Sequence, residues 1–178
     1  MLVETRDALA PDARIMVQAD ALVWRGLRHV TQVEHRDLLV VGSASECEEG
    51  RIRVGTNVDE LLEHLECPLA IAPAGLHQQR SPALRGVGVG FDGGPESQAA
   101  LDLGRSVASA AGVTLSVPTQ RELAAAGPAW ALGELSHQVD LLVIGSSRQG
   151  RPGRVGLAAT ERAVLLQAAC PVVVVPRP

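Results

Sequence analysis

Short apolar runs alternate with amphipathic stretches along this chain of 178 residues. Runs rich in Val, Ile and Leu predict buried strands, because strands of a sheet covered on both faces are apolar at consecutive positions. Apolar residues that recur every three or four positions predict helices between these runs. We expect strands at residues 13–18, 38–42, 69–72, 86–91, 113–117, 141–145 and 172–176, and helices at 21–36, 56–66, 96–111 and 160–169.

The order of these elements predicts the fold class. Strands that alternate with helices form βαβ units, and such units build a parallel sheet. One helical stretch connects the strands at 113–117 and 141–145, and Gly127 and Pro128 interrupt its pattern. The sequence therefore predicts an α/β fold, a parallel sheet flanked by helices.

Two apolar motifs occur twice. DLLVVGS at 37–43 returns as DLLVIGS at 140–146, and CPLAIAP at 67–73 returns as CPVVVVP at 170–176. Both pairs have the same separation, and a constant offset with matched Gly and Pro positions indicates an internal repeat. We interpret the chain as a tandem duplication.

The two predicted copies are unequal in length. Residues 1–73 form a partial first repeat, 74–85 a linker, and 86–178 a second, shortened repeat. The first strand of the second copy, GVGVGFD at 86–92, would have its counterpart before Met1. An incomplete first copy leaves apolar sheet surface uncovered, which favours association, so we expect a homodimer. Alternatively, the native chain starts upstream of Met1.

The charge argues against a nucleic-acid partner. The formal net charge is −4 and aromatic residues make up 2%, whereas nucleic acid requires a basic footprint and often aromatic platforms. All basic residues are Arg, so lysine-based phosphate binding and Schiff-base chemistry are excluded. No apolar run approaches the roughly 20 residues that cross a bilayer, and the N-terminus does not resemble a secretory signal. We expect no membrane span and a cytoplasmic protein.

Metal, disulfide and hydrolase chemistry have little support. The three cysteines, Cys47, Cys67 and Cys170, have no C-x-x-C spacing. His64 beside Cys67 is a weak metal pair without a carboxylate. The serines that follow strands are not part of a G-x-S-x-G motif. We expect no metal and no catalytic residue.

The glycine motif of the first copy has two interpretations. Gly42 ends a strand, and Gly55-Thr56 opens a helix with Asp59 three residues after Thr56. Thr56 and Asp59 would form a capping box, which satisfies amides at the helix start. The same amides and the absence of a glycine Cβ also suit a phosphate. The sequence leaves both interpretations open.

The order strand, Gly, long loop, Gly-Thr, helix, Cys-Pro and final strand, together with FDGGPES at 91–97, resembles the universal stress proteins. The resemblance covers nearly the whole chain and is closest to tandem members. It implies a flavodoxin-like (Rossmann-like) α/β fold, with repeats packed about a pseudo-twofold axis near strands 69–72 and 172–176. Many members of this family bind ATP through an Asp after the first strand and a G-x2-G-x9-G-[S/T] loop.

The resemblance names candidate nucleotide-binding residues, but each copy departs from the motif. In the second copy they are Asp92, Gly145, Arg148, Ala158 and Ala159, with Arg148 in place of the second glycine and Ala158-Ala159 in place of Gly-[S/T]. In the first copy they are Gly42, Ser45, Gly55 and Thr56, with Ser45 in place of the second glycine and no strand to supply the Asp.

These departures weaken a phosphate site. Ala159 lacks the hydroxyl of the Ser or Thr that it replaces, which removes one hydrogen bond, worth roughly 0.5 to 1.5 kcal/mol. Arg148 would be strained if its position required a positive φ. Alternatively, the arginines of this loop, Arg148, Arg151 and Arg154, attract phosphate or only solvate the loop. Asp92 either contacts a ligand or caps the helix after Pro95.

We therefore expect a non-enzymatic regulatory or stress-response module of the universal stress protein type, with a degenerate nucleotide site and no firm cofactor. Binding of ATP or AMP would be weak. The alternative is a competent nucleotide-dependent switch, with slow ATP hydrolysis, in which Asp92, Gly145 and the Arg148 loop hold the nucleotide.

Overall fold

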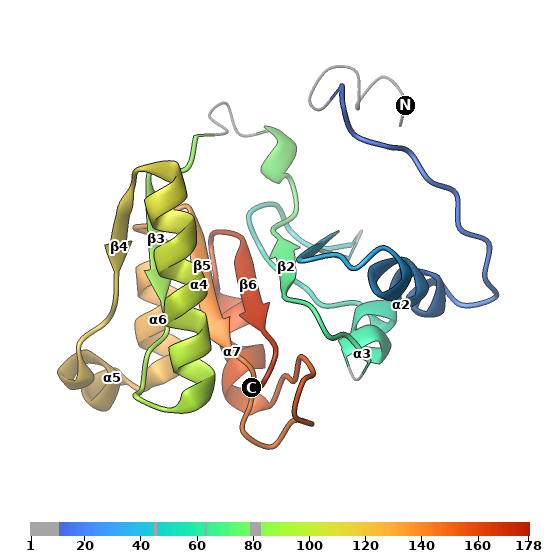
Figure 1. The fold of residues 1–178 in the computed structure, drawn as a ribbon. Helices are drawn as coiled ribbons and strands as arrows, with labels where there is room; N and C mark the ends of the chain where they lie inside the picture. The colour runs from blue at the N-terminus through green and yellow to red at the C-terminus, as the bar shows by residue number, and fades with distance from the viewer. Residues whose placement is uncertain (1–10, 45, 63, 79–82) are drawn as a thin grey trace.

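The computed structural model describes residues 11–44, 46–62, 64–78 and 83–178, and all structural statements concern these ranges. One sheet of six strands runs through the molecule in the order β1-β2-β6-β5-β3-β4 (Figure 1). The strands are β1 (Leu39–Gly42), β2 (Leu69–Ala72), β3 (Gly86–Val89), β4 (Thr114–Ser116), β5 (Leu141–Gly145) and β6 (Val172–Val175). The helices are α2 (Val23–Val33), α3 (Thr56–Leu62), α4 (Pro95–Ala111), α5 (Gln120–Ala126), α6 (Pro128–Ser136) and α7 (Ala159–Gln167), with a 3₁₀ turn η1 (Leu76–Gln78).

The predicted α/β class is confirmed, because neighbouring strands are parallel at four of the five pairings. The exception lies in the middle of the sheet, where β2 and β6 are antiparallel. At this junction Ala70 lies opposite Val173, and Leu69 and Ile71 lie opposite Val174 and Val172. Each half of the sheet is therefore parallel within itself, and the two halves meet in opposite directions.

The two halves share local structure at the predicted offset. Leu39 pairs with Leu69 in β1 and β2, and Leu142 pairs with Val172 in β5 and β6. Hydrogen bonds repeat in the same way: the hydroxyl of Ser43 donates to the Ala72 carbonyl over 2.8 Å, and that of Ser146 donates to the Val175 carbonyl over 2.6 Å. The amides of Gly50 and Gly153 likewise donate to the carbonyls of Ala74 and Arg177. Ancestry by duplication stays a prediction, and so do the predicted domain boundaries.

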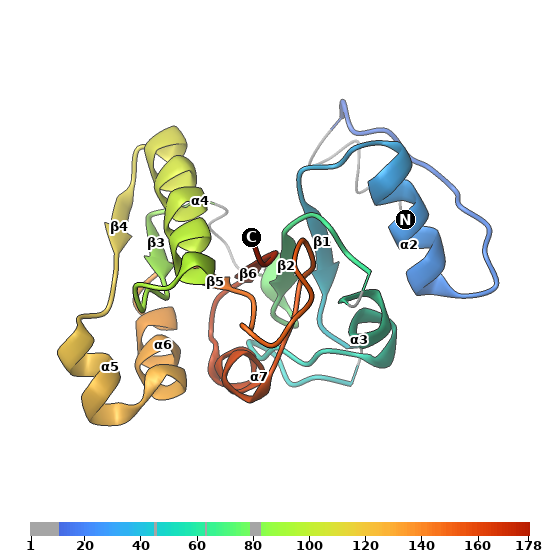
Figure 2. The ribbon, with the colours of Figure 1, turned by 60° about the horizontal axis from the view of Figure 1, so that its bottom comes forward.

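Helices cover both faces of the second half but only one face of β1. Helices α3, α6 and α7 lie on one face of the sheet and α4 lies on the other (Figure 2), and buried apolar residues of each set belong to a separate core cluster. Val143 of β5 lies under α4 and is fully buried, whereas its counterpart Val40 of β1 is 62% exposed. As the sequence predicted, the first half leaves apolar sheet surface uncovered.

The strand predicted at 13–18 does not form, since residues 13–20 have no regular secondary structure. In the second half, β3 separates the outermost strand β4 from β5. In the described residues no strand precedes β1, so a strand at 13–18 would have no counterpart of β3 to pair with. Val17 is accordingly 93% exposed.

The helical stretch between β4 and β5 is divided into two helices at Gly127 and Pro128, the residues at which the sequence predicted an interruption. Helix α5 ends at Gly127, whose φ of 84° lies in the region that favours glycine, and Pro128 starts α6. Helix α4 begins with Pro95 at its first position, as the sequence predicted. No helix of the described part of the chain is long and apolar enough to cross a membrane.

Candidate functional site

A cavity of about 690 Å³ lies at the carboxyl ends of β3 and β5, beside the first residues of α4 and α7. Ligands of open α/β sheets usually bind at this edge. Five residues predicted from the sequence line the cavity together: Asp92, Gly145, Arg148, Ala158 and Ala159. Phe91, Leu123, Leu132 and Ile144 form an apolar wall, and Glu96 and Glu161 add two carboxylates.

Asp92 is held by the chain itself. One carboxylate oxygen accepts hydrogen bonds from the Gly94 amide, over 2.9 Å, and from the Ser97 hydroxyl, over 2.8 Å. The Gly94 amide, followed by the Ser97 hydroxyl and the positive charge of Arg148, lowers the pKa of Asp92 below its ordinary value. Asp92 thus orders the turn before α4, although Gly94 and not Asp92 is the residue that precedes the helix.

Arg148 lies across the cavity and contacts Asp92. Its Nη2 is 2.8 Å from the second carboxylate oxygen of Asp92, and its Nε is 3.6 Å from a carboxylate oxygen of Glu96. The guanidinium also packs on Gly94, where an added Cβ would lie 2.5 Å from Nη2. Among the residues that the structure describes, His35 is the single non-glycine residue with a positive φ, so the position of Arg148 does not require a positive φ and the condition for strain is not met. The loop arginine therefore supplies its charge to the protein's own carboxylates.

Glu96 is a buried acid that the sequence did not single out. It lies in the first turn of α4 with its side chain 9% exposed. One carboxylate oxygen accepts a hydrogen bond from Nε of Arg177 over 3.3 Å, while the other has no hydrogen-bond partner in the described structure. Asp92 is the carboxylate that the sequence placed here, yet Glu96 is the more deeply buried one.

The start of α7 is occupied by a carboxylate of its own helix. Glu161 accepts a hydrogen bond from the Ala158 amide over 2.9 Å. That amide is among the free N–H groups that would bind phosphate at a helix N-terminus. A negative charge therefore stands where a phosphate would approach. The pattern of Glu three residues after the residue that precedes a helix could have revealed this cap in the sequence.

Packing explains why residue 145 is a glycine. A Cβ at this position would lie 2.5 Å from the carbonyl oxygen of Glu96, closer than real Cβ contacts. The glycine therefore allows β5 to end directly beneath the first turn of α4. Its counterpart Gly42 has nothing within 4 Å, because the first half has no helix at the equivalent place.

The candidate residues of the first half form no second site of this kind. Gly42 ends β1, and Gly55 precedes α3, which starts at Thr56. Thr56 is thus the first helical residue and not the cap, and Asp59 pairs with Arg162 in place of a capping box. Ser45 lies outside the described residues.

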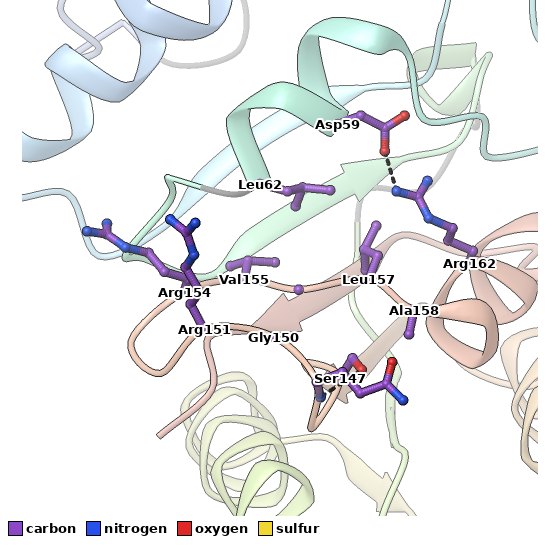
Figure 3. Close-up of a pocket in the computed structure, with 12 residues that line it drawn as sticks. Asp59, Leu62, Ser147, Gly150, Arg151, Arg154, Val155, Leu157, Ala158 and Arg162 are labelled. Carbon is purple, nitrogen blue, oxygen red and sulfur yellow. Dashed lines mark hydrogen bonds and ion pairs between the residues drawn. The ribbon is translucent and has the colours of Figure 1, made fainter.

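The loop after β5 borders a second cavity, of about 420 Å³, which α3 closes from the first half (Figure 3). Arg162 of α7 reaches over it to Asp59, 2.7 Å away. Arg154 donates to the carbonyl of His64 over 2.7 Å and pairs with Glu66. The loop arginines therefore have separate roles, in which Arg148 points to the first cavity and Arg154 ties the loop to the other half.

His64 and Cys67 do not form a metal site. The His64 ring stacks on Trp24 with ring centroids 5.1 Å apart, and Cys67 is buried. Over the described ranges, no group of three or more His, Cys, Asp or Glu side chains is arranged to hold a metal ion.

Comparison with known proteins assigns part of the chain to a family. The model of the universal stress protein family matches residues 126–176. Those residues belong to the universal stress protein family. They contain β5, the loop with Arg148, α7 and β6, so the family recognised from the sequence is confirmed at the cavity itself.

The universal stress protein fold extends beyond the matched residues. A solved structure from Pseudomonas aeruginosa UCBPP-PA14, assigned to the universal stress proteins, superposes with a TM-score of 0.59 and 16% identity over 98% of this chain and 76% of that one. A universal stress protein from Archaeoglobus fulgidus DSM 4304 gives 0.59 and 15% over 99% of this chain and 80% of that one. At such identities the likeness shows the fold alone. A search of the curated proteins gives no match.

Proposed function

We propose that this chain is a non-enzymatic regulatory module of the universal stress protein type whose nucleotide site is degenerate and binds little or no ATP. The observation that carries the proposal is the ion pair between Arg148 and Asp92, with 2.8 Å between nitrogen and oxygen. The ion pair engages Asp92, the residue that would contact the nucleoside, and Arg148, which stands at the loop position that would cradle a phosphate.

Two further observations support exclusion of a triphosphate. Glu161 accepts a hydrogen bond from the amide of Ala158, the residue that precedes α7, and Glu96 adds a buried carboxylate to the lining of the same cavity as Asp92. Like charges repel strongly when they are partly desolvated. ATP would therefore have to displace an ion pair and approach carboxylates on two sides.

A thermal-shift experiment with Mg-ATP and with AMP tests the proposal. The wild-type protein should show no change in Tm at millimolar nucleotide, because a ligand that binds only the folded state raises Tm measurably only when its concentration is comparable to its Kd or above it. The positive control is the variant Arg148→Gly/Ala158→Gly/Ala159→Ser, which restores the family motif. A rise of several degrees in the wild-type protein would refute the degenerate site.

The competent nucleotide switch remains the second candidate. It is favoured by the cavity of about 690 Å³ that Asp92, Gly145 and the Arg148 loop line together. In this case Arg148 would leave Asp92 and turn to the phosphates. The same titration separates the two candidates, and release of inorganic phosphate measures slow hydrolysis.

We further infer that the halves descend from one duplicated unit, that the chain forms a homodimer and that it acts in the cytoplasm. The duplication is supported by the matched registers on either side of the β2–β6 junction. The homodimer is supported by β1, an edge strand on which Val40 is exposed. Sedimentation equilibrium with wild-type protein and Val40→Lys measures the oligomeric state, and a wild-type monomer would contradict this part.

A further inference from the structure

The larger cavity carries more negative than positive charge. Asp92, Glu96 and Glu161 contribute three carboxylates to its lining, and Arg148 is the one basic residue among its described lining residues. Arg177 reaches Glu96 from outside this lining and satisfies only one of its oxygens. The cavity is therefore built to attract a positive group.

Glu96 gives a second, independent indication of a positive ligand. Its side chain is nine-tenths buried, and its Oε2 has no hydrogen-bond partner in the part of the chain that the structure describes. Nε of Arg148 forms an ion pair with this oxygen at 3.6 Å, which is too long for a hydrogen bond. A buried acceptor without a donor is unfavourable, so a donor placed between Asp92 and Glu96 would be stabilised.

Arg148 occupies this place only loosely. Its side chain is 64% exposed, and ion pairs at that exposure contribute little to stability. The guanidinium thus acts as a tethered cation that a free cation can replace. Phe91, Leu123, Leu132 and Ile144 also line the cavity and offer apolar surface that would accept a hydrocarbon stem.

We propose that this cavity binds a small organic cation, a guanidinium or ammonium group on a short apolar stem, which takes the place of the Arg148 guanidinium between Asp92 and Glu96. The inference rests on the proposed function, because a site that held a triphosphate would need the opposite charge. It adds the ligand class that the degenerate site accepts.

The experiment measures Tm of wild-type protein and Arg148→Ala with methylguanidinium and butylguanidinium chloride at low millimolar concentration, with sodium chloride at equal ionic strength as the blank. In Arg148→Ala, butylguanidinium at about ten times its Kd should raise Tm by about 3 to 5 °C. Methylguanidinium should bind more weakly, since it lacks the stem. The wild-type protein should need at least about tenfold more ligand, because its own guanidinium competes.

Matched variants locate the site. Arg151→Ala removes an arginine of the same loop that does not line this cavity, so it should behave as the wild-type protein. Adding Asp92→Asn or Glu96→Gln to Arg148→Ala should abolish the butylguanidinium shift. Circular dichroism confirms that each variant is folded, and if one acid variant does not fold, the other provides the test.

The outcomes separate this inference from the proposed function. No butylguanidinium shift in folded Arg148→Ala, or a shift that persists after Asp92→Asn or Glu96→Gln is added to it, overturns the cation site. If ATP also leaves the wild-type Tm unchanged, the degenerate site stands while the cation site fails. If ATP stabilises the wild-type protein and butylguanidinium does not stabilise Arg148→Ala, both fail.

Discussion

The guanidinium of Arg162 lies 2.7 Å from the carboxylate of Asp59, and the two residues are 103 positions apart in the sequence. This separation equals the offset between the two halves, so the pair joins equivalent positions of α3 and α7. Equivalent positions meet because β2 and β6 run antiparallel at the centre of the sheet. The two equivalent positions thus carry opposite charges, at a point where two identical residues would repel each other or make no bond.

Reversing one charge of this pair should weaken the junction, and reversing both should restore it. Asp59→Arg or Arg162→Asp should each lower the free energy of unfolding by about 1 kcal/mol, since both side chains are more than a third exposed and the pair is screened by solvent. The double variant should recover most of the loss. Urea unfolding measures the difference.

The pair of Arg105 and Asp102 on α4, 3.9 Å apart and well exposed, provides the control. Arg105→Asp should change the free energy of unfolding by much less. Equal effects of Arg105→Asp and Arg162→Asp would mean that the junction gains nothing from its charges.

Gly145→Ala and Gly42→Ala should have opposite effects although they occupy equivalent places. A Cβ at Gly145 would lie 2.5 Å from the Glu96 carbonyl oxygen, so overpacking should cost about 1 to 3 kcal/mol. At Gly42 nothing lies within 4 Å, and Ala should be neutral or slightly stabilising, because it restricts the unfolded chain. Urea midpoints of the two variants compare them directly, and a Gly145→Ala variant as stable as wild type would exclude the packing explanation.

Periodicity predicted the fold well because most elements bury their own apolar pattern. β5 and β6 are apolar at consecutive positions since helices cover both their faces, and the repeat offset predicted that β1 and β2 would match them. Residues 13–18 contain the apolar run Ile15, Met16 and Val17 but form no strand, since strand formation also depends on a neighbour that the local sequence does not encode.

The candidate site was predicted in part. Asp92, Gly145 and Arg148 lie together because they follow strands whose carboxyl ends share one edge of the sheet. Glu96 was missed, because an acid in the first turn of a helix is ordinary and its meaning depends on what lies opposite. Glu161 was missed although its place three residues after Ala158 is that of a capping box. The ion pair between Arg148 and Asp92 could not be predicted from the sequence either, since 56 residues separate the two.

Asp92 should make stability depend on pH in the acidic range. Its pKa is lowered, first by the Gly94 amide, from the ordinary value of 3.8, so the folded state favours the charged carboxylate. This contribution is fully present above 3.8 and is lost as the pH falls through the lower, folded-state pKa. The gap in Tm between wild-type protein and Asp92→Asn should therefore be constant near neutrality and shrink below about pH 4.

Salt distinguishes the causes of this shift. Because the Gly94 amide contributes more than Arg148, adding about 0.5 M sodium chloride should leave most of the gap in place, as screening acts on exposed charges. A gap that vanishes in salt would assign the shift to Arg148. A Tm difference that grows toward low pH would mean that the pKa of Asp92 is raised, and not lowered, in the folded state.

The three cysteines should differ sharply in reactivity. Burial raises the pKa of Cys170 to about 12 and also raises that of Cys67, whereas Cys47 is partly exposed. At pH 8 a thiol of pKa 12 is about one part in ten thousand thiolate, and the thiolate is the reactive form. Iodoacetamide should therefore label one cysteine of the native protein and all three cysteines in urea. Mass spectrometry of the intact chain counts the labels. Cys47→Ser should abolish native labelling, and labelling of Cys170 at a rate close to that of Cys47 would mean that the β5–β6 region opens in the native state.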